Sequence, residues 1–378
     1  MPGPPSGAGS RLVTFELRDS DPDVLVVTNA WPHAEDPSYG IFVQRQVESL
    51  RNVGVRVDVM FVRGYLSKLA YAVAAVSLAK LSRSGHPPYQ LVHSHGGETV
   101  LSAIAYRRVP VLASYFGSDL LGVPKADGSF PVSSRIRRTV QRESAKLVSH
   151  SITKSHEMHL ALPRSCRSRD EVVPNGVDDS IFVPMPRDYA RRLLGWDADA
   201  TIALFGGDPR NPGKRFWLAD AACKAASGRV SDLQIKTLSR VDPADVPLMM
   251  SAADCLVFTS VTEGSPNVVK EALMCDLPVI ATPAGDVSEL LQGVSPSWVC
   301  EASVGVIADA LTECLSAPKR SNGRSESSHL TTSAIAERVL SVYEGVLDGQ
   351  FRSRVGPAGD APRGVSSLPV SSGELGRG

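Results

Sequence analysis

The chain has 378 residues, of which 43% are hydrophobic and 21% charged. This length exceeds what one hydrophobic core usually serves, so we expect two domains, and the composition excludes disorder for most of the chain. Forty basic residues balance forty acidic ones, so no overall field attracts nucleic acid, and we expect no nucleic-acid partner.

Cysteine usage and the apolar segments bear on location. The six cysteines are scattered without metal-ligand spacing, which indicates reduced, mostly buried thiols. The start, MPGPPSGAGSR, lacks the apolar run of a secretory signal. The longest apolar stretch, 66–81, is broken by Lys68 and Lys80, as in an amphipathic helix. We expect a cytoplasmic protein, and contact with the inner face of the membrane stays open.

The first half alternates strand-like and helix-like segments. After a flexible lead over 1–22, Val24–Thr28 is a β-branched run typical of a strand buried in a parallel sheet. Residues 42–50 then place apolar side chains on one helical face. Further strand-like runs cover 55–61, 91–93, 109–114 and 147–152. Together they predict a doubly wound, Rossmann-like domain over 23–180.

The second half repeats this pattern. Its strand-like runs are Thr201–Phe205, Leu233–Thr237, 255–259 and Val279–Ala281. They predict a second Rossmann-like domain over 181–330, after a hinge rich in turn residues, VVPNGVDDSIFVPMPRD. Residues 331–350 carry a helical apolar pattern, and 351–378 are rich in Gly, Ser and Pro, which predicts a disordered tail.

Four stretches of the sequence carry a family resemblance. In chain order they are PSYGIFVQRQVESLRNVGVRVDVM, ASYFGSDLLG, VVPNGVDDSIFVP with ARRLLGW, and TEGSPNVVKEALMCDLPVIATPAGDVSELL. Together they resemble the GT-B glycosyltransferases of family four. The resemblance implies an α/β fold of two Rossmann-like domains facing a central cleft, with the acceptor in the first, the donor in the second, and the last helix returning to the first. It also implies a retaining, metal-independent transfer, without a cofactor, from a nucleoside-diphosphate sugar, with UDP favoured, to a hydroxyl acceptor.

Two glutamates, Glu263 and Glu271, flank a loop that leads into a helix. The loop consists of Gly264, Ser265, Pro266 and Asn267. The free backbone N–H groups of a helix N-terminus suit a diphosphate. The resemblance implies that Glu271 accepts the ribose hydroxyls and that Glu263 contacts the transferred sugar as a catalytic residue. The alternative is a pair of solvated glutamates at helix ends.

A glycine-rich loop, LFGGDPRNPGKRF, follows the first strand of the second half. Gly206 and Gly207 permit close approach to the donor, and Lys214 is the candidate cation for the leaving diphosphate. The family usually has an arginine where this chain has Gly207. Arg210 or Arg215 is therefore a candidate replacement, although either also fits a solvated turn.

Three residues of the first half are further candidates. Gly40 lies between the first strand and the first helix, where doubly wound folds bind ligands, so it is a candidate contact for the acceptor, and it is also compatible with a simple turn. Asp119 is either a catalytic contact or a helix cap. Near it, Phe116 stands where the family often has histidine, which leaves the sugar specificity open. His95 is a candidate contact for the acceptor.

Two features have alternative interpretations. His93 and His95 face one side of a strand with Glu98 nearby, but without a third ligand at metal spacing we expect polar contacts and no metal. Basic residues recur at helical spacing at Arg135, Arg138, Arg142 and Lys146, which suits either an anionic acceptor, lipid headgroups or a solvated face.

The predicted function is transfer of a sugar to a cell-surface glycan precursor, which includes lipid-linked acceptors, or to a small aminocyclitol or other metabolite. The alternatives are a GT-B epimerase or phosphorylase and a non-catalytic subunit that binds nucleotide sugar, which Gly207 and Phe116 make conceivable. The sequence leaves the oligomeric state open.

Overall fold

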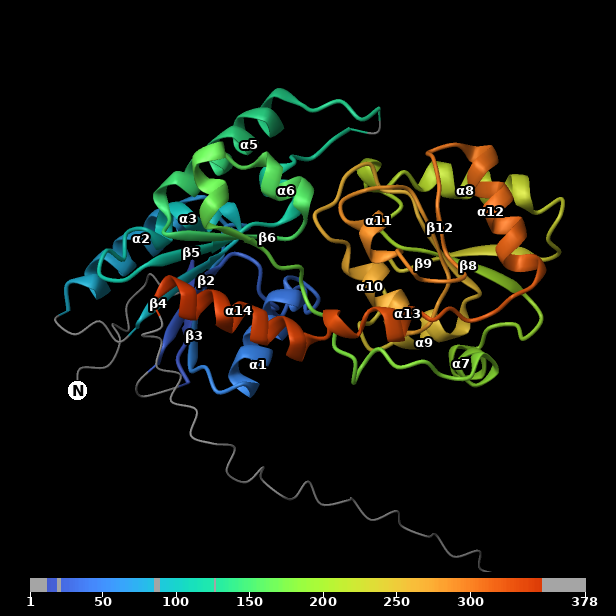
Figure 1. The fold of residues 1–378 in the computed structure, drawn as a ribbon, viewed down its shortest axis with the longest axis horizontal. Helices are drawn as coiled ribbons and strands as arrows, with labels where there is room; N and C mark the ends of the chain where they lie inside the picture. Colours follow the sequence, from blue (N-terminus) through green and yellow to red (C-terminus); the bar gives the residue numbers. More distant parts are fainter. Residues whose placement is uncertain (1–11, 19–21, 85–88, 126, 349–378) are drawn as a thin grey trace, which may run out of the picture.

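The computed structural model describes residues 12–18, 22–84, 89–125 and 127–348, which form two α/β domains (Figure 1). Within this part of the chain each domain is built on one β-sheet. The two-domain α/β architecture predicted from the sequence is therefore confirmed. The tail expected to be disordered, 351–378, and most of the lead expected over 1–22 lie outside the described residues.

The N-terminal sheet has the strand order β1-β3-β2-β4-β5-β6-β7. Its strands are β1 (Val13–Glu16), β2 (Val24–Thr28), β3 (Val57–Val62), β4 (Leu91–His95), β5 (Val111–Ser114), β6 (His150–Thr153) and β7 (Asp170–Val172). Neighbours run parallel, except that β1 is antiparallel to β3. The prediction of a flexible lead through residue 22 is wrong for β1, because this segment pairs with the open edge of β3.

Helices cover both faces of this sheet, and they bury its β-branched strands completely at β2 and β3. They are α1 (Ile41–Asn52), α2 (Leu69–Ser82), α3 (Gly97–Ala103), α4 (Gly117–Leu120), α5 (Val132–Ser144), α6 (His156–Ala161) and α14 (Thr332–Val346). Side chains of α2 and α3 pack on one face, and side chains of α1 and α14 pack on the other. The carboxyl ends of the parallel strands remain available for a site.

The last helix, α14, packs on the N-terminal domain although it follows the C-terminal domain in the chain (Figure 1). Its Ile335 and Val339 are buried together with Val24 and Val26 of β2. The hydroxyl of Tyr343 lies 2.7 Å from Nδ1 of the buried His93. The chain therefore crosses between the domains a second time, and the second crossing completes the first core.

The C-terminal sheet has the strand order β12-β11-β10-β8-β9, with all neighbours parallel. Its strands are β8 (Thr201–Phe205), β9 (Leu233–Thr237), β10 (Cys255–Phe258), β11 (Val279–Ala281) and β12 (Trp298–Val299). The helices are α7 (Arg187–Leu194), α8 (Phe216–Ala226), α9 (Val246–Ala252), α10 (Asn267–Met274), α11 (Val287–Leu290), α12 (Val304–Ser316) and α13 (Gly323–Glu326). Two apolar clusters cover its two faces.

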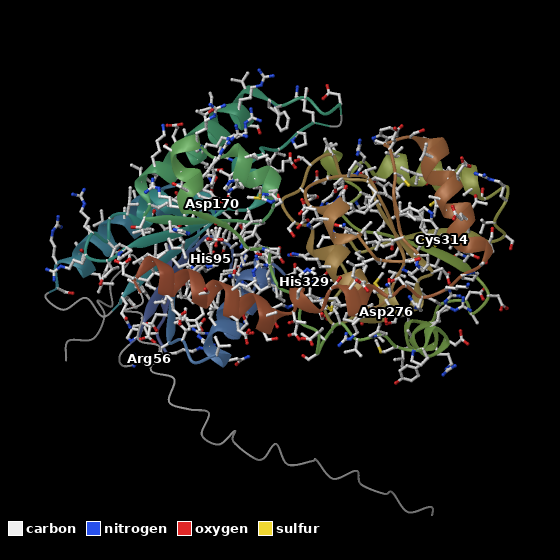
Figure 2. The ribbon with its side chains drawn as sticks, in the orientation of Figure 1. Arg56, His95, Asp170, Asp276, Cys314 and His329 are labelled. Carbon is white, nitrogen blue, oxygen red and sulfur yellow. The ribbon has the colours of Figure 1, made fainter. Side chains whose placement is uncertain are left out.

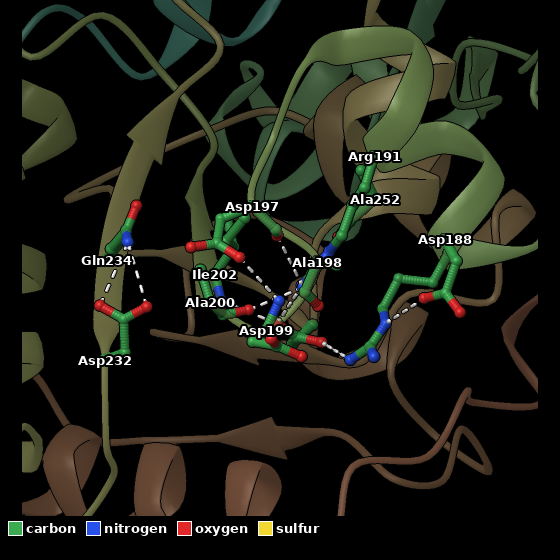
Figure 3. Close-up of polar contacts among 12 residues, drawn as sticks. Asp188, Arg191, Asp197, Ala198, Asp199, Ala200, Ile202, Asp232, Gln234 and Ala252 are labelled. Carbon is green, nitrogen blue, oxygen red and sulfur yellow. Dashed lines mark hydrogen bonds and ion pairs between the residues drawn. The ribbon is translucent and has the colours of Figure 1, made fainter.

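A buried arginine of α7 connects this helix to the C-terminal sheet through an ion pair and hydrogen bonds. Arg191 is 1% exposed at its side chain and forms an ion pair of 2.8 Å with Asp254. It also donates to the carbonyl oxygens of Ala198, Ala200 and Ala252 at 2.7, 2.7 and 2.9 Å (Figure 3). A buried guanidinium needs such partners to offset its desolvation, so this network holds α7 where the second domain begins.

The structure also bears on the cysteines and the apolar segments. All six cysteines are free and buried, as predicted. In the described residues no helix is both long and apolar enough to cross a membrane.

Candidate active site

A cavity of about 380 Å³ lies at the carboxyl ends of β8, β9 and β10. Most of the residues expected at the donor line it: Gly206, Gly207, Lys214, Glu263, Ser265, Pro266, Asn267 and Glu271. Leu238, Val246 and Val268 add an apolar wall. This position, outside the carboxyl ends of parallel strands, is where ligands bind in open α/β sheets.

The first glutamate of the predicted pair meets the predicted lysine. Lys214 Nζ lies 2.5 Å from Glu263 Oε1, and both side chains are about one quarter exposed. The lysine belongs to a short 3-10 turn, Pro212–Lys214, whose last carbonyl accepts a hydrogen bond from Thr259 Oγ1 at 2.8 Å. Residues far apart in the sequence thus place one positive and one negative charge on the same wall of the cavity.

The second glutamate stands on α10 and keeps its hydrogen-bonding capacity. Across the described part of the chain, the Glu271 carboxylate accepts no hydrogen bond, and its nearest cation is Arg45, with Nη1 3.6 Å from Oε1. Burial raises the pKa of Glu271, and Arg45 and Lys270 act in the opposite direction. Its oxygens are therefore free to accept bonds from a pair of hydroxyls.

A buried lysine supports the loop between these glutamates. Lys270 is 0% exposed, and its Nζ donates to Asn175 O at 2.8 Å and to Ser265 Oγ at 3.0 Å. Burial lowers the pKa of Lys270 to about 8 and raises that of Asp286 to about 6. No local pattern in the sequence indicates this support, because a lysine on a helix usually points into solvent.

Glycines bring the two domains together beside the cavity. A Cβ added to Gly117 of the N-terminal domain would lie 2.5 Å from the backbone nitrogen of Gly264. Within the C-terminal domain, a Cβ on Gly285 would lie 2.6 Å from Gly264 O, and Gly285 also has a φ of +65°. Such distances are shorter than side-chain atoms tolerate, so only glycine permits this approach.

The two candidate arginines do not line the cavity. Arg210 is 63% exposed at its side chain and pairs with Asp208 at 2.6 Å. Arg215 donates from Nε to Thr259 O at 2.7 Å and from Nη2 to Ser260 O at 2.9 Å. These bonds hold Arg215 against the end of β10, so the structure brings Lys214 alone of the three predicted cations to the cavity wall.

Gly40 and Asp119 have structural partners in the N-terminal domain. Gly40 has a φ of +69°, and a Cβ there would lie 2.1 Å from the carbonyl carbon of Ala30. This requires a glycine in the turn before α1. Asp119 Oδ2 accepts from the backbone nitrogens of Phe116 and Gly97, both at 2.9 Å, as a helix cap does. The geometry thus gives the capping role to Asp119, and burial raises its pKa.

His95 is buried at the end of β4, within the N-terminal domain (Figure 2). Among the residues that the structure describes, neither ring nitrogen of His95 has a hydrogen-bond partner, and burial lowers the pKa of His95 to about 3, so the ring is neutral. His93 beside it contacts Tyr343 and Ser114 at 2.7 and 2.8 Å. In the part of the chain that is described, no group of three or more His, Cys, Asp or Glu residues is placed to hold a metal ion.

Comparisons with known proteins identify the family. The model described as "Glycosyltransferase Family 4" matches residues 12–181, and that described as "Glycosyl transferases group 1" matches residues 175–317. A relative assigned to teichuronic acid biosynthesis, the glycosyltransferase TuaC of Bacillus subtilis, is 23% identical over 76% of this chain and 88% of its own.

Solved structures share the fold. Sucrose-phosphate synthase from Thermosynechococcus elongatus has a TM-score of 0.69 at 17% identity, over 87% of this chain and 100% of its own. HepE from Anabaena, solved in complex with UDP-glucose, has a TM-score of 0.62 at 17% identity, over 85% and 99%. The family models meet within the linker and together span residues 12–317, so the chain belongs to glycosyltransferase family 4 and has the GT-B fold.

Proposed function

We propose that the protein transfers a sugar from a UDP-sugar to a hydroxyl acceptor with retention of the anomeric configuration. One observation carries this proposal: Glu263, Glu271 and Lys214 surround a single cavity together with the N-terminus of α10. A cavity with a few convergent polar groups at the carboxyl ends of strands suits a nucleotide sugar. The UDP-glucose complex of HepE favours UDP as the nucleotide.

Each polar group has a role that matches its surroundings. Glu271, with free oxygens, accepts the two ribose hydroxyls, and Glu263 accepts from the transferred sugar. Lys214 and the first backbone N–H groups of α10 stabilise charge on the leaving diphosphate. When the donor binds, the Lys214 side chain moves from Glu263 toward the diphosphate. Its positive charge then stabilises the leaving diphosphate, as a divalent cation does in other enzymes.

We assign the acceptor to the N-terminal domain, which meets the donor domain beside the cavity at Gly117 and Gly264. TuaC is named for teichuronic acid biosynthesis, which supports a glycan precursor as the acceptor, whereas the D-inositol 3-phosphate glycosyltransferases that also match support a small cyclitol. The outer face of α5 exposes Val132, Ile136 and Val140 by 71, 61 and 50%, next to exposed arginines of the same helix. Such a helix suits anionic lipid, so we place the enzyme in the cytoplasm, in contact with the inner face of the membrane.

The purified protein tests this proposal directly. We expect UDP-sugars to raise its melting temperature, and one of them to yield free UDP together with a glycosylated product when cell extract supplies the acceptor. Turnover should persist in EDTA. A protein that binds the donor but never releases UDP would instead be the non-catalytic subunit, and turnover restored only by magnesium or manganese would contradict the role of Lys214.

A further inference from the structure

One arginine reaches from the N-terminal domain to the wall of the donor cavity. Arg45 lies on α1, and its Nη1 is 3.6 Å from Oε1 of Glu271 on α10. The two side chains are 16 and 18% exposed. The pair is thus a contact between domains, formed at the carboxylate that the proposed function assigns to the ribose.

Arg45 has few other contacts. Its guanidinium lies 5.5 Å from the ring centroid of Phe182, a buried residue of the linker. Among the described residues it donates no hydrogen bond, although a guanidinium has five N–H donors. The ring of Phe182 holds the guanidinium in place, while the N–H donors of the guanidinium remain available beside Glu271.

The other cation near Glu271 is already engaged. Lys270, the preceding residue on α10, donates to Asn175 O and Ser265 Oγ. Burial disfavours the charged form of Glu271, and a carboxylic acid is a poorer acceptor for hydroxyl groups than a carboxylate. Arg45 is therefore the cation placed to keep this group charged without competing bonds of its own.

We propose that Arg45 is a positioning residue of the donor site, which holds the Glu271 carboxylate ionised and oriented toward the ribose from the opposite domain. This inference rests on the proposed function, because it assumes that Glu271 binds the nucleotide. The nucleotide site is then complete only when α1 and α10 face each other.

Titration calorimetry of the full chain with UDP tests the proposal. We expect R45Q to weaken UDP binding roughly tenfold, an effect between those of exposed and fully buried ion pairs. R45K should recover part of the loss because it restores the charge. Arg51→Gln is the matched control, since Arg51 lies on the same helix, is 14% exposed and pairs with Glu16 away from the cavity. It should leave UDP binding unchanged.

The pH profile distinguishes positioning from a merely structural role. Among the described residues, the charged or titratable groups that act on Glu271 are Arg45 on α1, Lys270 on its own helix and Cys275. Lys214 and Glu263 lie on the wall of the same cavity. UDP affinity should fall as the pH drops through the pKa of Glu271. Without Arg45 that pKa rises, so the acid limb of the profile should move to higher pH in R45Q. The limb should be absent in E271Q.

A double variant decides whether Arg45 acts through Glu271. We expect R45Q/E271Q to bind UDP as E271Q does. A further loss of UDP affinity in the double variant would mean that Arg45 contacts the nucleotide itself. Normal UDP binding by R45Q would mean that Arg45 has no role in the donor site. Either result overturns the inference. If E271Q binds UDP normally, the proposed function fails first, so the two failures are distinguishable.

Discussion

At the scale of single residues, the two glutamates of the cavity differ in how closely a cation pairs with them. Glu263 is paired with Lys214 at 2.5 Å, whereas Glu271 faces Arg45 at 3.6 Å and keeps its oxygens free. A ligand that binds Glu263 must displace Lys214 or bind beside it, whereas a ligand that binds Glu271 finds its carboxylate oxygens without hydrogen bonds among the described residues. The two residues should therefore respond differently to substitution.

Replacing each carboxylate by an amide tests this difference. E271Q should weaken both UDP and UDP-sugar by one to two decades, because about 1.5–3 kcal/mol is lost with each bond to a charged acceptor. E263Q should bind free UDP almost normally and lose turnover instead. Calorimetry with both ligands and a turnover assay give the comparison. Equal weakening by both variants, or none, would contradict the assigned roles.

A buried lysine should control the pH dependence of stability. Lys154 is 2% exposed, and its Nζ has no hydrogen-bond partner within the described part of the chain. Burial lowers the pKa of Lys154 to about 7. In the unfolded chain it keeps its proton up to pH about 10.4. Between these values the unfolded state binds the extra proton, so the free energy of unfolding rises with pH. Lys270 acts in the same direction from its pKa of about 8.

Lys154→Met should therefore stabilise the protein at pH 7, on the order of 1–4 kcal/mol, and flatten the rise toward pH 10. Urea unfolding at pH 7, 8.5 and 10 measures both effects. Equal slopes in the variant and the parent protein would show that Lys154 is not the titrating group.

The predicted site residues that line the cavity are those that lie in local motifs. Each of these residues follows a strand that the sequence predicts: Lys214 follows β8, and Glu263 and the GSPN loop follow β10. Because the carboxyl ends of parallel strands lie at one edge of the sheet, these residues are close together in space. Arg45 and Lys270 could not be found this way. Their partners lie in another domain or in the linker, and no local spacing encodes such contacts.

At the scale of elements, α14 is the clearest case of a helix stabilised by a distant partner. Ile335 is 1% exposed within the cluster that contains β2. Ile335→Ala should cost about 2–5 kcal/mol in the free energy of unfolding, whereas Glu337→Ala on the exposed face of the same helix should change it by less than about 0.5. Chemical denaturation measures both, and equal effects would argue against this packing.

Most strands whose bounds the sequence predicted are buried, although Leu233–Thr237 is an edge strand of intermediate burial. Val24–Thr28, Thr201–Phe205, Leu233–Thr237 and Val279–Ala281 have the bounds expected from their β-branched runs. The sequence missed β1, β7 and β12, which lie at the edges of the sheets. β7 and β12 have only three and two residues, too few for a periodic pattern, and β1 depends on pairing with β3.

At the scale of the whole molecule, the contact of Gly117 with Gly264 limits how closely the domains approach. Gly117→Ala should hold them apart, because the added Cβ would lie 2.5 Å from the Gly264 nitrogen. We expect turnover to fall about tenfold or more with a smaller loss of UDP affinity, since misplacement by about an ångström impairs transfer more than binding. Gly305→Ala, where a Cβ meets nothing within 4 Å, is the control. Unchanged turnover in Gly117→Ala would contradict a role for this contact.

The return of α14 to the first domain also matters during synthesis on the ribosome. Val24 emerges early, but Val339 and Tyr343, which cover it, are translated after the whole second domain. Nascent chains usually fold from the N-terminus, domain by domain. Here α1 covers part of this face of β2 early, but the part that α14 covers stays open until residues 332–346 have been translated, so the nascent first domain lacks part of its apolar cover while the second domain is being made.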